Sequence, residues 1–489
     1  MANLSRTFGN RSRRTGEAIW IMLGVLLLGC ALALPLGASD DTALALILLG
    51  TAVIAYLVFP SRWQLWSLVA IAVYFQPLEA LQLPISQSNV HLLDLFVAMT
   101  LVGWLIRWAL QMHTWRLTRR SGYLLAAILA ILLIPALVGM LKGNIVVTVL
   151  RDMRVPFYYI TLSLLVVSSV RTRADLVTTL RGIALLILPA LAYYFVSWAL
   201  GIPTSEGAST VILSSGRYLR YGLVTSWEYI MLSWLLGLAL FLTGDVPPQW
   251  RPWLALYTLL STVALMALLV RGIYLGMLGG LVTVVLFSHW LRNPQRLISA
   301  GLVLLVLGGL VVAADAAAGT GLVAAVGERV LSIVDPRAST SSSAANRETR
   351  LETTRFIGNS ARGTSNPLIG AGYGDRGAYA YSRDSELQAL FRHSAYSWLF
   401  YRVGFVQGIL ILLLFAVVAW RAGRLAWRME NSLLRATIVT FLAAFIANFF
   451  VGLGNNTIFD FFGAFSVQVA VEFAILLKLD LLLQPAVSA

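Results

Sequence analysis

Charged residues are scarce in this chain. Only 12% of the 489 residues are Asp, Glu, Lys or Arg, whereas 59% are hydrophobic and the mean hydropathy is +0.81. Soluble domains carry about 25% charged residues, so the composition excludes an ordinary soluble domain. Cysteine is scarcer still, since Cys30 is the only one, and this excludes an internal disulfide and any metal site built from several cysteines.

Lysine is almost absent as well. Of the 36 basic residues, only Lys142 and Lys478 are lysines, and the rest are arginines. The planar, permanently charged arginine side chain suits bidentate recognition of phosphate. A GC-rich genome would give the same excess, so the ratio alone does not choose between the two explanations.

Long apolar runs fill most of the chain instead. Runs of about 17 to 25 residues recur from end to end, and each can cross a hydrocarbon core of about 30 Å as a helix. We therefore predict an all-α fold, a polytopic transmembrane helical bundle of about 12 to 14 spans with one long periplasmic loop region containing short helices. The predicted spans lie near residues 18–37, 42–59, 64–83, 91–110, 122–141, 156–170, 176–200, 222–242, 252–270, 272–289, 297–315, 395–420, 433–453 and 457–480.

One segment, 316–394, is the only sizeable part that does not fit a membrane, and it divides the chain into three. Residues 1–315 are predicted to hold about eleven spans, and residues 395–489 the remaining ones. Within the loop region, the charged stretch 346–357 is expected to form a short helix. The glycine-rich stretch 366–374 is expected to be a mobile loop with exposed backbone N–H groups, because no predicted strand precedes it as a dinucleotide-binding fingerprint requires.

Basic residues near the span ends predict the orientation, because Lys and Arg are retained in short cytoplasmic loops. With the basic N-terminus inside, most basic clusters also fall inside, and an even number of spans returns the C-terminus to the cytoplasm. Some basic residues break this rule, and we expect them to have a use because they oppose correct insertion. Besides nine arginines in residues 316–394, the exceptions are Lys142, Arg151, Arg154, Arg217, Arg220 and Arg271.

Three pairs of external arginines share one spacing, with two residues between the partners. Residues i and i+3 of a helix share a face, so each pair is expected to present two guanidinium groups to one anionic ligand. The alternative is that these side chains reach lipid headgroup phosphates, and the spacing leaves both open. The pairs are Arg151 and Arg154, Arg217 and Arg220, and Arg347 and Arg350.

Arg271 interrupts a long apolar stretch in Val270-Arg271-Gly272-Ile273-Tyr274. The stretch is long enough for two spans, and the only room for a turn is around Gly272. Arg271 is therefore expected at the external membrane boundary between two helices. Contact with lipid headgroups is one use for such an arginine, and we favour a functional role.

His393 is the only histidine of the loop region, and it lies in Arg392-His393-Ser394, immediately before a predicted span. That position is the external membrane surface, where the reactive end of a lipid-linked substrate also lies. A neutral imidazole can accept a proton from a sugar hydroxyl, and arginines beside it can stabilise a departing diphosphate. A histidine that is only the polar tip of a helix is the alternative.

Together these residues resemble the superfamily of O-antigen ligases and O-antigen polymerases. The resemblance covers roughly residues 205–455, and it depends on the order and sidedness of short motifs. The motifs are Arg217 and Arg220 before a glycine and a new span, Arg271-Gly272 opening a helix, Pro367-Leu-Ile-Gly370-Ala-Gly372, and His393-Ser394.

Two positions depart from the family pattern. Ser394 stands where the family often has Asn, and Ser226-Trp227-Glu228 stands where it often has Pro-Asn. Glu228 is instead expected to pair with a nearby arginine at the membrane edge.

The resemblance implies an integral glycosyltransferase of the bacterial inner membrane with a periplasmic active site. It would move a glycan from undecaprenyl diphosphate, inverting the anomeric carbon, without a metal or other cofactor. The acceptor of a ligase is lipid A–core, and that of a polymerase is a second lipid-linked glycan. No nucleic acid is implied. We favour the ligase, because its periplasmic surface must bind two polyanionic lipids and many basic residues are external.

The resemblance also assigns roles to single residues. His393 would activate or position the acceptor hydroxyl, and Arg271 would act with it in catalysis by holding the diphosphate. Either Arg217 or Arg220 is the family's second diphosphate-binding arginine. We add to these the predicted diphosphate ligands Arg151 and Arg154 and the predicted loop contacts Arg347, Arg350 and Arg392.

Two other readings stay open. Other polyprenyl-phosphate glycosyltransferases use acidic residues in the first external loop, where Asp40-Asp41 lies, but that loop is too short for the usual substrate-binding helices. A transporter of the same lipid would favour charges near the bilayer midplane and internal repeats. Glu472 is the one deeply placed acid, and no repeat accompanies it.

Overall fold

The computed structural model describes most of the helical part of the chain. Apart from single positions between 53 and 57 and between 298 and 319, it describes residues 60–74, 92–110, 119–200, 209–213, 216–220, 227–243, 246–288, 321–334, 367–375, 395–453 and 464–483.

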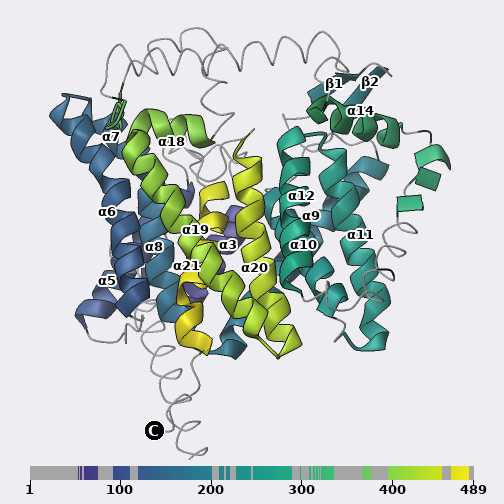
Figure 1. The fold of residues 1–489 in the computed structure, drawn as a ribbon, viewed down its shortest axis with the longest axis horizontal. Helices are drawn as coiled ribbons and strands as arrows, with labels where there is room; N and C mark the ends of the chain where they lie inside the picture. Colours follow the sequence, from purple (N-terminus) through teal and green to yellow (C-terminus); the bar gives the residue numbers. More distant parts are fainter. Residues whose placement is uncertain are drawn as a thin grey trace, which may run out of the picture.

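The described part is a bundle of helices that run side by side (Figure 1). Among the described residues, four helical spans are long and apolar enough to cross a membrane: Ser121–Leu141, Arg173–Ser197, Phe405–Arg428 and Ser432–Val451. Shorter apolar helices accompany them at Arg154–Ser169, Trp227–Leu242 and Arg271–Phe287. The prediction of an all-α helical membrane protein is confirmed.

The first half of the bundle consists of α3 (Ser61–Val73), α5 (Leu92–Ala109), α6 (Arg119–Leu141), α7 (Val146–Asp152), α8 (Arg154–Ser169) and α9 (Arg173–Ala199). An antiparallel hairpin follows, made of β1 (Ser209–Leu213) and β2 (Gly216–Arg220). The remaining helices are α10 (Trp227–Thr243), the 3₁₀ turn η3 (Pro248–Trp250), α11 (Arg251–Ala267), α12 (Arg271–Phe287), α14 (Leu322–Val334), α18 (Ala395–Val403), α19 (Phe405–Arg428), α20 (Ser432–Val451) and α21 (Ala464–Leu483).

Local signals in the sequence explain several helix ends. Thr172 and Asp175 form a reciprocal capping box before α9, in which each side chain accepts the backbone N–H of the other, at 3.1 and 2.9 Å. Asn431 caps α20 by accepting a backbone N–H of the first turn at 2.9 Å. The Lys478 ammonium donates to two carbonyls at the end of α8, which a helix leaves without partners.

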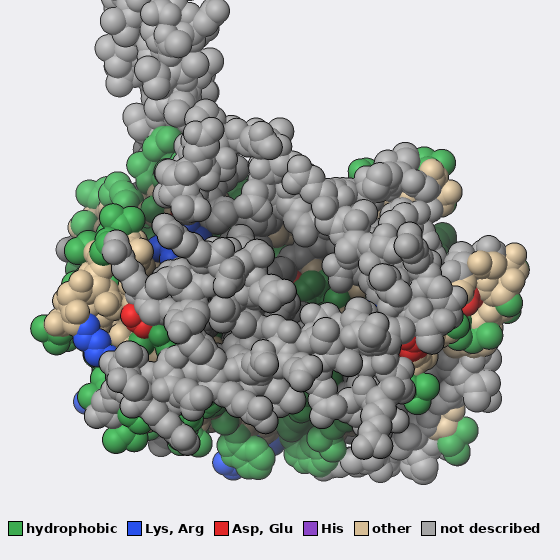
Figure 2. Space-filling model, turned by 90° about the horizontal axis from the view of Figure 1, so that it is seen from above, with side chains coloured by type: hydrophobic (Ala, Val, Ile, Leu, Met, Phe, Trp, Pro, Cys, Tyr) green, Lys and Arg blue, Asp and Glu red, His purple; other side chains and the backbone are tan. Residues whose placement is uncertain are grey.

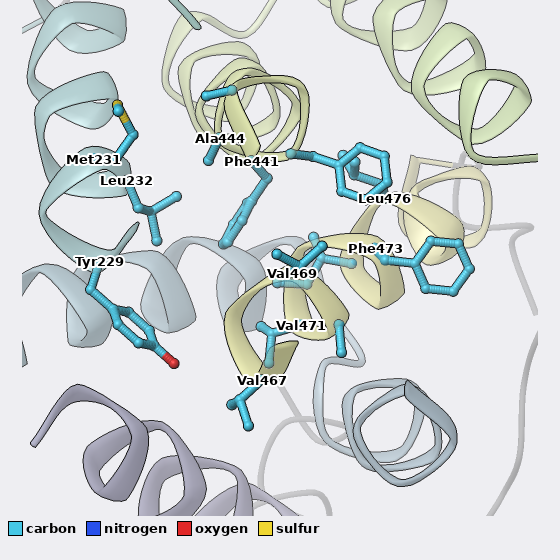
Figure 3. Packing of buried hydrophobic residues seen from close by; sticks show 14 of the residues in the cluster. Tyr229, Met231, Leu232, Phe441, Ala444, Val467, Val469, Val471, Phe473 and Leu476 are labelled. Carbon is cyan, nitrogen blue, oxygen red and sulfur yellow. The ribbon is translucent and has the colours of Figure 1, made fainter. Parts of the chain in front are cut away.

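The core lies where α10, α20 and α21 meet (Figure 3). Side chains on every side of α21 are buried, among them Val469, Val471 and Phe473. A helix that is apolar all round belongs in the interior, and α8 is buried in the same way along most of its length. In contrast, α6, α9 and α19 each leave an apolar face exposed, as expected for helices that contact lipid.

The two ends of the bundle differ. The short helices α7 and α18, the β-hairpin and α14 gather at one end (Figure 1), which we call the α18 end. The opposite end holds the described part of the predicted cytoplasmic basic clusters: Arg62, Arg107, Arg119, Arg171, Arg173, Arg251, Arg421, Arg424, Arg428 and Arg435.

Most predicted spans agree with the helices of the described part to within a few residues, and two do not. The span predicted near 64–83 is longer than α3, which ends at Val73. The apolar run 395–420 is not a single span, because Gly404 separates α18 from α19 with a φ of 86°. Only a glycine adopts this conformation without strain. Spans predicted near 18–37 and 42–59, and most of 297–315, lie outside the described residues.

Candidate functional site

The predicted site residues divide into three groups. Arg151, Arg154 and Arg271 are described with their side chains, and Arg217 and Arg220 are described at the level of the backbone. The remaining predicted residues lie outside the described part of the chain: Arg347, Arg350, Arg392 and His393.

Arg271 is the first residue of α12, at the α18 end. It lies at the boundary between two helices, as predicted, but the turn is not around Gly272, which is helical. The turn lies before Arg271, where Leu269 adopts a φ of 51°. A left-handed residue other than glycine costs about 1–2 kcal/mol. Leu269 is buried against Ala325 and Val326 of α14, and this packing offsets the strain.

The surroundings of Arg271 suit an anion. Its Nε and one of its terminal nitrogens are buried, although the residue as a whole is half-buried. The first backbone N–H groups of a helix have no partner within it, and they carry the positive end of the helix dipole. A guanidinium and a helix N-terminus therefore lie together here, and both attract phosphate.

Two neighbours of α12 are fixed by close packing. Gly276 faces Met231 of α10 and Val451 of α20, and one turn further on Gly280 faces Leu235 of α10. Since each step is four residues on both helices, α10 and α12 run parallel, and both begin at the α18 end. The end of α20 lies beside the second turn of α12.

The start of α18 is attached to the same place. The amide of Ala395 donates to the carbonyl of Gly452, directly after α20, at 3.0 Å. The hydroxyl of Tyr396 donates to the carbonyl of Phe449 at 2.8 Å. The first turns of α12 and α18 and the last turn of α20 are therefore neighbours. His393 itself lies outside the described residues, two positions before Ala395.

The stretch Pro367–Asp375, which we call the glycine strap, is a second feature of the α18 end. We predicted a mobile loop with exposed N–H groups, and that prediction is wrong: the strap is buried from Gly370 to Gly374. Its amides are used, because those of Ala371 and Gly372 donate to carbonyls of α18 at 2.8 and 3.0 Å, and that of Tyr373 donates to a carbonyl of α6 at 2.9 Å.

A buried ion pair holds the strap from below. Arg402 of α18 contacts Asp152 of α7 at 3.3 Å, and their side chains are 3% and 0% exposed. The Asp152 carboxylate also accepts the amide of Gly374 at 2.8 Å, and Arg402 donates to the carbonyls of Gly372 and Asp375 at 3.3 Å. The sequence prediction missed Arg402, although it carries the signal that identified Arg271, an arginine inside an apolar run.

Tyr401 of α18 also contacts the glycine strap. Its hydroxyl donates to the Asp375 carboxylate at 2.5 Å. Burial, reinforced by the Asp375 carboxylate, raises the pKa of Tyr401 above its ordinary value. The hydroxyl therefore keeps its proton, and its hydrogen bond, throughout the physiological range.

The pair Arg151 and Arg154 does not form the predicted two-armed anion clamp. Arg154 contacts the Asp94 carboxylate of α5 at 2.8 Å, and Tyr158 donates to the same carboxylate at 2.5 Å. The charge of Arg154 is thus neutralised inside the protein, with its side chain 10% exposed. Lys142, another external exception, donates to the carbonyl of Gly370 in the strap at 2.8 Å.

Arg217 and Arg220 also differ from the prediction. They lie in strand β2, paired with Ile212 and Ser209 of β1, so the helical i, i+3 geometry does not apply to them. The signal for a hairpin was present, because β-branched residues of β1 are followed by Ser214-Ser215-Gly216.

Seen from above, the described side chains that are visible near the centre of the α18 end are hydrophobic and acidic (Figure 2). Comparison with family models finds no matching family, and comparison with curated proteins finds no match.

Proposed function

We propose that this chain is an inner-membrane glycosyltransferase of the O-antigen ligase type. It moves a glycan from undecaprenyl diphosphate to lipid A–core, and its active site lies at the α18 end. Inversion at the anomeric carbon follows from a single displacement, in which the acceptor hydroxyl attacks opposite the departing diphosphate.

Arg271 is the observation that carries the proposal. An arginine at the first position of a helix is unfavourable beside the positive end of the dipole, and it gains most when an anion binds there. The diphosphate is such an anion, and its charge grows as the glycosidic bond breaks, so the site would stabilise the transition state more than the substrate. His393 is assigned to the acceptor hydroxyl because Ala395, two residues later, lies at the neighbouring end of α20.

The distribution of charge supports a periplasmic site. The end opposite to α18 carries the basic clusters that short cytoplasmic loops retain. The α18 end would then face the periplasm, where a glycan carried by undecaprenyl diphosphate meets lipid A–core.

Substitution of Arg271 tests the proposal directly. In liposomes supplied with undecaprenyl-diphosphate-linked glycan and lipid A–core, the wild-type protein is expected to transfer the glycan. Arg271→Lys keeps the charge but loses the planar fork, and kcat should fall by about 10² to 10³. His393→Ala should lose transfer as well. Arg424→Lys, an exposed arginine at the opposite end, is the matched control and should behave like the wild type.

The outcomes separate the alternatives. Full activity in Arg271→Lys would rule out a bidentate clamp, and full activity in His393→Ala would remove that residue from the reaction. Growth of glycan on the lipid-linked donor, with lipid A–core left unmodified, would identify a polymerase instead.

A further inference from the structure

Directly beneath the candidate site lies a cluster of buried polar side chains. The two oxygens of the Glu472 carboxylate accept the side-chain amides of Gln468 at 2.6 Å and Asn448 at 3.1 Å. The Gln468 amide also donates to the carbonyl of Glu228 at 3.0 Å. This chain of contacts joins α21 and α20 to the first turn of α10, and all four residues are buried.

Glu228 lies at the level of Arg271. Met231 faces Gly276 and Leu235 faces Gly280, so one turn earlier the start of α10 lies beside the start of α12. Packed helices have axes about 8–10 Å apart. The helix starts that carry Glu228 and Arg271 are therefore adjacent at the α18 end.

Two buried polar atoms in the cluster point to a ligand. Oε1 of Gln468 and the hydroxyl of Tyr229 have no hydrogen-bond partner among the described residues, and these residues are 2% and 1% exposed. The Tyr229 hydroxyl points towards the start of α21 (Figure 3). A buried polar atom without a hydrogen-bond partner destabilises the protein. A ligand hydroxyl could form hydrogen bonds with both atoms, so the cluster suits a hydroxyl group.

We propose that Glu228 is the group that takes the proton from the acceptor hydroxyl. This inference rests on the proposed function. The hydroxyl oxygen forms a bond to the anomeric carbon, and the bond from that carbon to the diphosphate breaks. Its electron pair leaves with the diphosphate held by Arg271, while the hydroxyl proton passes to the Glu228 carboxylate. His393 then orients the acceptor.

Glu472 is the less suitable of the two acids. It lies four residues after Gln468, whose amide contacts the carbonyl of Glu228, and this places it about 6 Å deeper along α21 than that contact. Its role is to hold Gln468, which in turn fixes the first turn of α10.

The test compares carboxylates with amides of the same length. Glu228→Gln should lower kcat for transfer at least ~100-fold, because a general base contributes about 10² to 10⁴, with the KM for the lipid-linked donor unchanged. Glu228→Asp should keep measurable transfer, and Glu228→Asn should not. Glu328→Gln removes an acid of α14 at the same end and is the control with wild-type rates.

Each result decides something. Equal rates in Glu228→Asp and Glu228→Asn, or a wild-type rate in Glu228→Gln, would overturn the inference while leaving the proposed function intact. The Asp and Asn variants have the same size, so their comparison stays valid if Glu228→Gln fails to fold. Absence of transfer by the wild-type protein would overturn the proposed function and this inference with it.

Discussion

Arg402 and Asp152 form the most deeply buried ion pair that the described residues make. Burying two charges costs several kcal/mol for each, and their attraction repays this only when the remaining polar atoms are also satisfied. Here the Gly374 amide and two strap carbonyls supply those contacts. The pair therefore depends on the strap, and the strap depends on the pair.

Removing Arg402 should be far more costly than removing an exposed arginine. Arg402→Gln leaves Asp152 buried without its charge partner, and we expect a loss of about 3–5 kcal/mol in the free energy of unfolding. Arg62 contacts Asp175 at 4.0 Å with its side chain 52% exposed, so Arg62→Gln should cost less than about 1 kcal/mol. Reversible unfolding in detergent measures both. Equal losses would contradict the burial argument.

The sequence pattern predicted a functional position for Arg271 but not for Arg402. Arg271 was predicted because its apolar stretch is too long for one span, which leaves an interruption to be explained. Arg402 carries the same signal, but its run fits a single span, so nothing in the pattern required a break at Gly404. Its partners Asp152 and Gly372 are distant in the chain, and periodicity gives no information about such pairs.

At the scale of elements, the strap and the α18–α19 corner fit each other through glycines. Gly370 has a φ of 79°, and a Cβ there would overlap the backbone of Arg402 and Gly404. The amides of Phe405 and Val406, the first residues of α19, donate to carbonyls of the strap at 3.0 and 3.3 Å. The strap thus fills the gap that opens where α18 turns into α19.

Alanine substitutions at two glycines distinguish backbone strain from the overlap of an added Cβ with neighbouring atoms. Gly143 also has a positive φ, 75°, but nothing lies within 4 Å of the position of its Cβ. Gly143→Ala should therefore lower the free energy of unfolding by the backbone strain alone, which is about 1–2 kcal/mol. Gly370→Ala adds the overlap with α18, so its loss should be clearly larger. If thermal unfolding in detergent shows the same shift for both, the close fit of the strap is not required.

The helices were predictable from the sequence where the length and hydrophobicity of an apolar run determine its structure. The predicted spans 91–110 and 433–453 match α5 and α20 closely, because about 20 apolar residues can be stable only as a helix in lipid. The strap and the β-hairpin lie outside that constraint. Their conformations follow from contacts with α6, α7 and α18 and from strand pairing, which an apolar pattern does not encode.

For the molecule as a whole, the central question is which way the bundle faces. The basic residues at the end opposite to α18 favour that end as the cytoplasmic one. The two external exceptions Lys142 and Arg154 no longer argue against this orientation, because each is bonded to a partner inside the protein. The orientation thus agrees with a site at the α18 end that is open to periplasmic substrates.

The single cysteine makes this orientation measurable. With Cys30→Ser as background, Leu368→Cys places one thiol in the strap, where Leu368 is 55% exposed, and Arg424→Cys places one near the end of α19. In intact spheroplasts, a membrane-impermeant maleimide should label Leu368→Cys and leave Arg424→Cys unlabelled. After the membrane is made permeable, both should react. The reverse pattern in intact spheroplasts would place the α18 end, and with it Arg271 and Glu228, in the cytoplasm, where lipid A–core carried on the periplasmic leaflet could not reach them.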